Sequence, residues 1–132
     1  MAVPRILLVV PLVVAGMYLP AAGHDPAPPA QGVLGMTHEH FTARKVTLAC
    51  GQTLPMTNSS RWVHIIGSGE EGVLVDAPRG VPVTKRVLVE TDQAYTTGPW
   101  TVPGDYHITC AIHPEMNVEV VVTGCCCGGT SV

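Results

Sequence analysis

The sequence predicts an all-β domain, a Greek-key β-sandwich or barrel of about eight short strands. Two observations support this prediction. From Arg44 onwards, short runs rich in β-branched residues alternate with turn residues. Over the same region, no amphipathic pattern of ordinary helix length appears. Strands this short and this closely spaced are typical of antiparallel sandwiches, in which residues far apart in sequence meet at one end of the fold.

Turn residues separate the expected strands. Cys50-Gly51 closes the first strand, Gly98-Pro99 falls within the sixth, and Pro103-Gly104 precedes the seventh. The last run shows the strict alternation of a strand that is buried on one face. The expected strands are residues 44–49, 53–58, 62–66, 72–76, 85–90, 95–101, 105–110 and 117–123.

The segments outside these strands divide the chain. Residues 1–22 have a short basic start, an apolar run and small residues, which is the layout of a secretory signal peptide. A retained membrane anchor is the alternative, although the run contains Pro11 and Pro20. Residues 23–43 are rich in Pro, Ala and Gly and predict a flexible linker. We expect the folded domain over 44–124, followed by a Cys-rich tail over 125–132. A secreted chain would work in the periplasm or another extracytoplasmic space.

The charge balance excludes one class of partner. The 132 residues contain 7 Lys and Arg against 10 Asp and Glu, a formal net charge of −3. Nucleic-acid-binding domains carry a basic surface, which this composition does not provide. We therefore expect no nucleic-acid binding.

A candidate metal-binding motif lies between the last two expected strands. Cys110, His113 and Met116 are spaced three residues apart, immediately before residues 117–123. Thiolate and thioether sulfur are soft donors, and imidazole suits copper. Two imidazoles and a thiolate with a weak axial Met form the donor set of blue-copper electron-transfer sites. The motif therefore predicts a copper site that needs one more histidine.

Of the six histidines, His64 is the best placed to complete this site. It lies within the expected strand 62–66, six residues after Asn58. The preceding block, residues 45–58, contains a Gly51-x-Thr53 turn that leads into a strand ending at Asn58.

A second block precedes the metal-binding motif. Trp100 and Tyr106 flank Gly104 in an aromatic-x3-Gly-x-Tyr run that leads to Cys110. Together, the two blocks and the ligand spacing resemble the cupredoxins, specifically their small amicyanin- and plastocyanin-like branch. The resemblance covers residues 45–122, which is most of the expected domain.

This resemblance implies one type 1 copper ion per chain and a cupredoxin-like sandwich. The implied role is one-electron transfer between Cu(II) and Cu(I), not enzymatic catalysis; copper storage or delivery with the same fold is the alternative. His113 would be the exposed electron port, in an apolar patch to which redox partner proteins dock, and the chain would work as a monomer. The implied ligands are His64, Cys110, His113 and Met116. The residues that could form the patch are Met56, Ile65, Ile112 and Pro114.

The remaining histidines and cysteines lie outside this site. His38 and His40 are interpreted as parts of a solvated linker, with a weaker second metal site that includes His24 or Met36 as the alternative. His107 is expected at the surface. A tetrahedral zinc site made by Cys110, His113 and tail cysteines is a further alternative. Cys50 is interpreted as a buried small side chain, or as the disulfide partner of a tail cysteine; Trp62, Trp100 and Tyr106 are expected to pack in the core.

Overall fold

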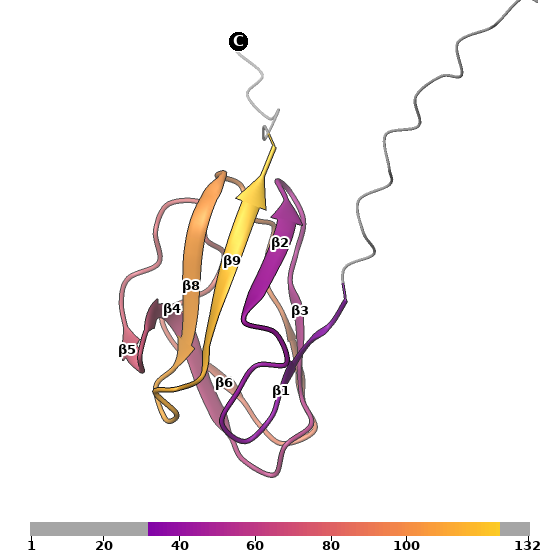
Figure 1. The fold of residues 1–132 in the computed structure, drawn as a ribbon, viewed down its shortest axis with the longest axis vertical. Helices are drawn as coiled ribbons and strands as arrows, with labels where there is room; N and C mark the ends of the chain where they lie inside the picture. The colour runs from indigo at the N-terminus through magenta and orange to yellow at the C-terminus, as the bar shows by residue number, and fades with distance from the viewer. Residues whose placement is uncertain (1–31, 125–132) are drawn as a thin grey trace, which may run out of the picture.

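The computed structural model describes residues 32–124, which form nine strands in two sheets (Figure 1). Within this range there is no helix, and so none that is long and apolar enough to cross a membrane. The predicted all-β sandwich is confirmed. The predicted signal peptide and the Cys-rich tail, with Cys125 to Cys127, lie outside the described residues. The strands are β1 Leu34–Met36, β2 Lys45–Ala49, β3 Pro55–Asn58, β4 His64–Glu70, β5 Val73–Leu74, β6 Val87–Val89, β7 Ala94–Thr96, β8 Gly104–Cys110 and β9 Asn117–Thr123.

The larger sheet has the order β2-β9-β8-β4-β5, with β6 also paired to β4. β8 and β9 run antiparallel and are joined by the loop that contains the candidate ligands, so Thr109 lies opposite Asn117. β4 pairs with β8 on its other side, and Ile66 lies opposite Cys110. This register places the start of β4 next to the end of β8, although the two are more than forty residues apart in sequence.

The smaller sheet, β1-β3-β7, corrects the predicted domain boundary. β1 lies within the segment predicted to be a linker and pairs in parallel with β3, with Leu34 opposite Met56. Leu34 and Met36 are buried, and Gly35 approaches Thr42 so closely that a Cβ there would lie 2.6 Å from the Thr42 methyl group. The folded domain therefore begins ten residues before position 44. The strand was not predicted because it is only three residues long and follows a Pro- and Ala-rich segment.

The core between the sheets contains the alternating apolar residues of β4, β8 and β9, together with Trp100. Trp100 is fully buried, and its Nε1–H donates to Oγ1 of Thr97 at 3.1 Å. Tyr106 is half-buried against it, with ring centroids 5.6 Å apart. The expected core role is confirmed for these two aromatic residues, but it is wrong for Trp62, which is 54% exposed.

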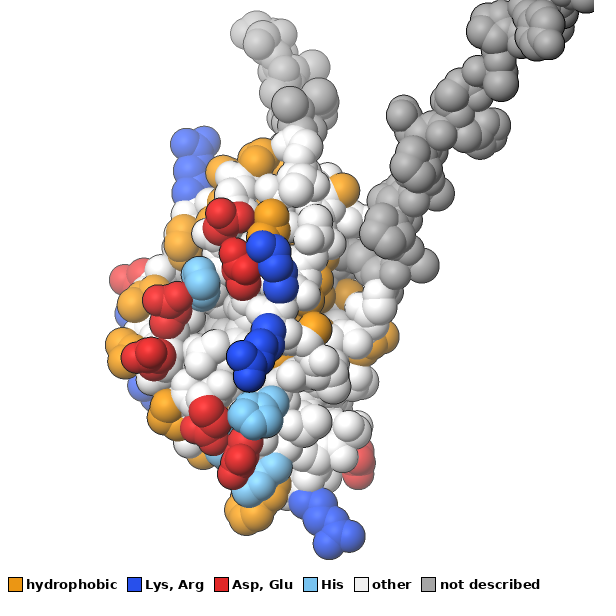
Figure 2. Space-filling view, viewed as in Figure 1, with side chains coloured by type: hydrophobic (Ala, Val, Ile, Leu, Met, Phe, Trp, Pro, Cys, Tyr) orange, Lys and Arg blue, Asp and Glu red, His pale blue; other side chains and the backbone are white. Residues whose placement is uncertain are grey.

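The surface made by β2, β9 and β8 carries acidic, basic and histidine side chains intermixed (Figure 2). His107 lies on this face, exposed as predicted, with Nδ1 2.8 Å from Oε1 of Glu70. Cys50, at the end of β2, is disulfide-bonded, so the preferred interpretation of a buried free thiol is wrong.

Candidate metal centre

The four predicted ligands lie at one end of the sandwich. His64 is the first residue of β4, Cys110 is the last residue of β8, and His113 and Met116 belong to the loop between β8 and β9. In Figure 1 this loop is at the lower end of the molecule, opposite the end where β9 finishes. His64, Cys110 and Met116 are fully buried, whereas His113 is half-buried.

Three of these residues form a compact donor group. Sγ of Cys110 lies 3.7 Å from Nδ1 of His64 and 3.7 Å from Nδ1 of His113. The three donor atoms all lie within 4.8 Å of one another. Bonds of about 2.3 Å to sulfur and about 2.0 Å to nitrogen, at trigonal angles, would separate S and N by about 3.7 Å. Both sulfur–nitrogen separations therefore match those expected around one metal ion.

The ligand loop is closed by its own backbone. Met116 N–H donates to the His113 carbonyl at 2.9 Å, and Cys110 N–H donates to the Met116 carbonyl at 3.1 Å. The Thr109 hydroxyl donates to the same Met116 carbonyl at 3.2 Å. Because these bonds span only seven residues, they fix the spacing of the thiolate, the imidazole and the thioether before any metal binds.

A hydrogen-bonded cluster orients His64. The Ser60 hydroxyl donates to Oδ1 of Asn58 at 2.7 Å and lies 3.1 Å from Nε2 of His64. The Ser60 hydroxyl hydrogen has two acceptors, Oδ1 of Asn58 and the Trp62 carbonyl at 3.1 Å, so the hydroxyl oxygen is left to accept from Nε2–H. This tautomer leaves Nδ1 with a free lone pair directed at the donor group, which is the usual arrangement of a metal-binding histidine.

The electrostatic surroundings keep His64 neutral. Burial lowers the pKa of His64 from its ordinary value of 6.5, and the neighbouring His113 and His38 lower it further, against a hydrogen bond to the Thr37 backbone that raises it. A neutral imidazole is the form that binds a metal. The site is therefore able to bind a metal ion at neutral pH without first displacing a proton from this ring.

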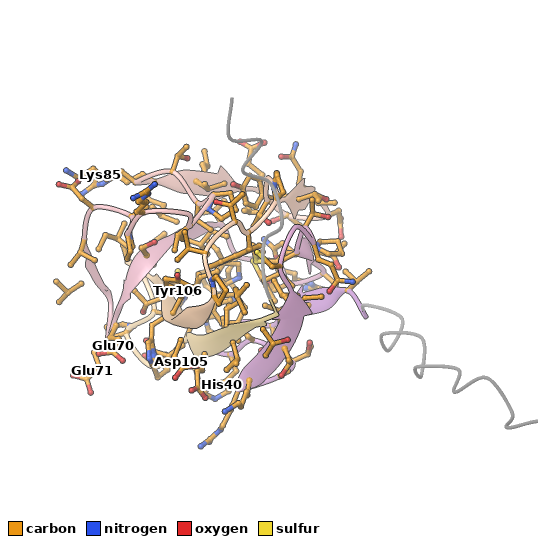
Figure 3. The ribbon with its side chains drawn as sticks, turned by 90° about the horizontal axis from the view of Figure 1, so that it is seen from above. His40, Glu70, Glu71, Lys85, Asp105 and Tyr106 are labelled. Atoms are coloured by element: carbon orange, nitrogen blue, oxygen red, sulfur yellow. The ribbon has the colours of Figure 1, made fainter. Side chains whose placement is uncertain are left out.

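The turn between β4 and β5 supports the ligand loop from outside. Glu71 N–H donates to Oδ1 of Asn117 at 2.8 Å, and a Cβ at Gly72 would lie 3.1 Å from the Pro114 ring. Gly72 has φ of +79°, which also favours glycine. The Glu70 and Glu71 side chains point outward in Figure 3, so this turn meets the loop through its backbone.

The segment predicted to be a linker reaches the site. The His38 ring stacks on Trp62 with centroids 4.6 Å apart and meets the His113 ring edge-on at 5.2 Å. His38 is therefore exposed, as predicted, but it packs on the folded domain and does not belong to a free linker. His40 lines a different surface hollow with Arg44 and Glu115, and within residues 32–124 neither histidine belongs to a second group of metal donors. His24 lies outside the described residues.

The predicted apolar patch is only partly present. Ile112 and Pro114 are exposed beside His113, and Ile65 is half-buried. Met56 is buried in β3, beside Leu34 of the neighbouring strand β1, so its inclusion in the patch is wrong.

Comparison with known structures identifies the architecture. Amicyanin from Paracoccus versutus (Thiobacillus versutus) superposes with a TM-score of 0.54 at 22% identity, over 74% of this chain and 86% of that one. A reduced Cu(I) form of an amicyanin mutant gives 0.55 at 20% identity, over 75% and 87%. A purple cupredoxin from Nitrosopumilus maritimus gives 0.52 at 19% identity, over 64% and 82%. The chain has the cupredoxin fold. No protein-family model and no curated protein matches the sequence.

Three residues of this site have contacts that were not predicted from the sequence. Ser60 carries no local signal, since a serine after Asn58-Ser59 predicts only a turn. Trp62 precedes a buried strand, so it was assigned to the core by residue type. His38 was assigned by the composition of its segment. For His38 and Trp62 the contact depends on the return of a distant segment, and for Ser60 it depends on the conformation of the turn between Asn58 and His64. Local sequence specifies neither.

Proposed function

We propose that this protein is an extracytoplasmic type 1 copper protein that carries one electron at a time. The observation that supports this function best is the donor group of His64, Cys110 and His113, in which Sγ lies 3.7 Å from each Nδ1. Met116, fully buried at the end of the same loop, would supply a thioether as the fourth donor. The cupredoxin fold and the softness of these donors favour copper over zinc.

Each residue has a distinct role in the proposed site. Copper, when bound, supplies the one-electron Cu(II)/Cu(I) couple. Cys110 binds as a thiolate, which its complete burial shields from competing oxidation. His64 and His113 bind as neutral imidazoles, the first held by Ser60. The closed loop backbone keeps the donors in place in both oxidation states, so little reorganisation accompanies electron transfer.

The donor set also supports a carrier in preference to an enzyme. Four protein donors, three of them fully buried, leave no open coordination position for a substrate. Partner redox proteins would approach the end of the sandwich where His113, the one half-buried ligand, lies beside the exposed side chains of Ile112 and Pro114. In this proposal the chain is secreted and works as a monomer, and its mixed surface charge does not favour nucleic acid.

The test is the visible absorption and EPR spectrum of the full chain loaded with Cu(II). We expect an intense thiolate-to-copper charge-transfer band with narrow copper hyperfine splitting. Cys110→Ser should abolish the band, and His64→Gln should disrupt it, whereas the matched control His107→Gln should leave it intact because His107 is exposed and bonded to Glu70. A weak band with wide hyperfine splitting that survives Cys110→Ser would mean adventitious copper and refute the proposal.

A further inference from the structure

An aromatic pair covers the outer side of the candidate copper ligand His113. His38 and Trp62 stack nearly parallel, with an interplanar angle of 14° and centroids 4.6 Å apart. The His38 ring also stands edge-on to His113, at 82° and 5.2 Å. The side chain of His38 is 49% exposed and Trp62 is 54% exposed, although His113 itself is half-buried. The rings of His113, His38 and Trp62 therefore form a continuous series from the Cys110 thiol to solvent.

The chain holds His38 in this position from both sides. Met36 and Phe41 are buried on either side of it and form a bridge between their backbones. Within the turn, Thr37 N–H and the Thr37 hydroxyl both donate to the His40 carbonyl at 2.9 Å. His38 thus lies at the tip of a tight turn whose two ends are anchored in the core.

Two hydrogen bonds hold the backbone of Trp62. Its carbonyl accepts from Nδ2 of Asn58 at 2.7 Å, and its N–H donates to the Ser60 hydroxyl at 3.2 Å. The same Ser60 hydroxyl contacts His64. An exposed tryptophan fixed by the cluster that orients a ligand is not explained by packing, because about half of its surface is in water.

Given the function proposed above, we infer that the His38–Trp62 stack, and not the edge of His113, is the electron port of this protein. Electronic coupling falls steeply with the gap between donor and acceptor, and a partner can approach only as far as the outermost atoms. Those atoms belong to the stack, which also contacts His113. With copper bound, His113 and His38 would carry one electron between the metal and a one-electron partner docked on the pair, so that one is oxidised as the other is reduced.

The surroundings of the stack suit close approach. Val63 follows Trp62 in the chain and Ile112 precedes His113, and both are exposed apolar side chains. Glu39 is the charged neighbour of the stack, with Oε1 3.9 Å from Nδ1 of His38, and its side chain is 53% exposed. A second copy of the protein in the opposite oxidation state can therefore meet the apolar side chains while Glu39 stays in contact with water. Electron self-exchange between the two forms therefore reports on the port without knowledge of the physiological partner.

The experiment measures the self-exchange rate of the copper-loaded full chain from NMR line broadening in mixtures of the Cu(I) and Cu(II) forms. We expect His38→Ala and Trp62→Ala each to lower the rate several-fold, with the visible spectrum unchanged. The double variant should be no slower than the slower single variant, because both rings belong to one path. His38→Phe should restore the rate, since it keeps a ring in the stack. The control His40→Ala, in the same turn but facing another hollow, should have no effect.

Three outcomes would overturn the inference. An unchanged rate in His38→Ala would show that the stack is not on the path. A faster rate would show that His38 shields the port and that His113 itself is the port. A slower rate with an altered visible spectrum, not restored by His38→Phe, would show that His38 only supports the structure of the site. If wild-type protein lacks the charge-transfer band, the proposed function fails first, and that result is distinct from all three.

Discussion

Asn58 connects three segments around the candidate site, and its removal is the sharpest test of how the site is held. The side chain is 1% exposed. The two Nδ2 hydrogens are shared among three carbonyls, those of Trp62 at 2.7 Å, Val89 at 3.2 Å and Glu90 at 3.1 Å. Oδ1 accepts from the Ser60 N–H at 3.0 Å and from the Ser60 hydroxyl at 2.7 Å. One amide therefore joins the end of β3, the loop before β4 and the end of β6.

The expected cost of Asn58→Ala follows from these bonds. The bond to Val89 is fully buried, so its carbonyl loses a donor that water cannot replace, at about 2 kcal/mol. The other four bonds are partly buried, and water can substitute for them at a combined cost of about 1 kcal/mol. The total loss is about 3 kcal/mol in the free energy of unfolding. This loss lowers the urea concentration at the midpoint of unfolding by about 2 M.

The assay is urea unfolding of the metal-free protein, followed by tryptophan fluorescence. Asn58→Asp is the decisive companion variant, because it keeps the shape but replaces the Nδ2 donors with an acceptor facing three carbonyls. It should be at least as destabilising as Asn58→Ala. Thr57→Ala, at the exposed neighbouring position of β3, should change stability by less than about 0.5 kcal/mol. Wild-type stability in Asn58→Asp would refute the donor role assigned here.

Three further predictions address the domain boundary, the loop support and the ionisation of His64. Met36→Ala should cost about 2–5 kcal/mol because Met36 is fully buried, whereas Val33→Ala, at an exposed position, should be nearly neutral by the same urea assay; equal effects would argue against docking of β1. Because both glycines have a positive φ, Gly72→Ala and Gly51→Ala should each lower the free energy of unfolding by about 1 kcal/mol. Only Gly72→Ala, which displaces Pro114, should shift the copper absorption band. In metal-free protein the unfolded chain protonates at the ordinary histidine pKa of 6.5 and folded His64 only at lower pH, so the free energy of unfolding should decrease as the pH falls below 6.5. His64→Gln should flatten this dependence, and an unchanged slope would contradict it.

The ligand loop shows what local sequence can predict. Cys110, His113 and Met116 lie within seven residues, between two strands with clear alternation, so their proximity depends on one hairpin connection. His64 required more, because its distance from Cys110 depends on the pairing of β4 with β8. It was predicted because a sandwich brings strand ends together and because the resemblance to cupredoxins indicated the position.

The chemistry of the site and the class of fold were thus determined by the sequence itself, through residue types at short spacing and through strand periodicity. Tertiary structure alone decided that β1 joins the smaller sheet and that His38 reaches Trp62 and His113. Each of these contacts joins segments whose own residues are compatible with several conformations. The choice among them depends on burial of Leu34, Met36 and Phe41 against the rest of the core, which is a property of the assembled sandwich.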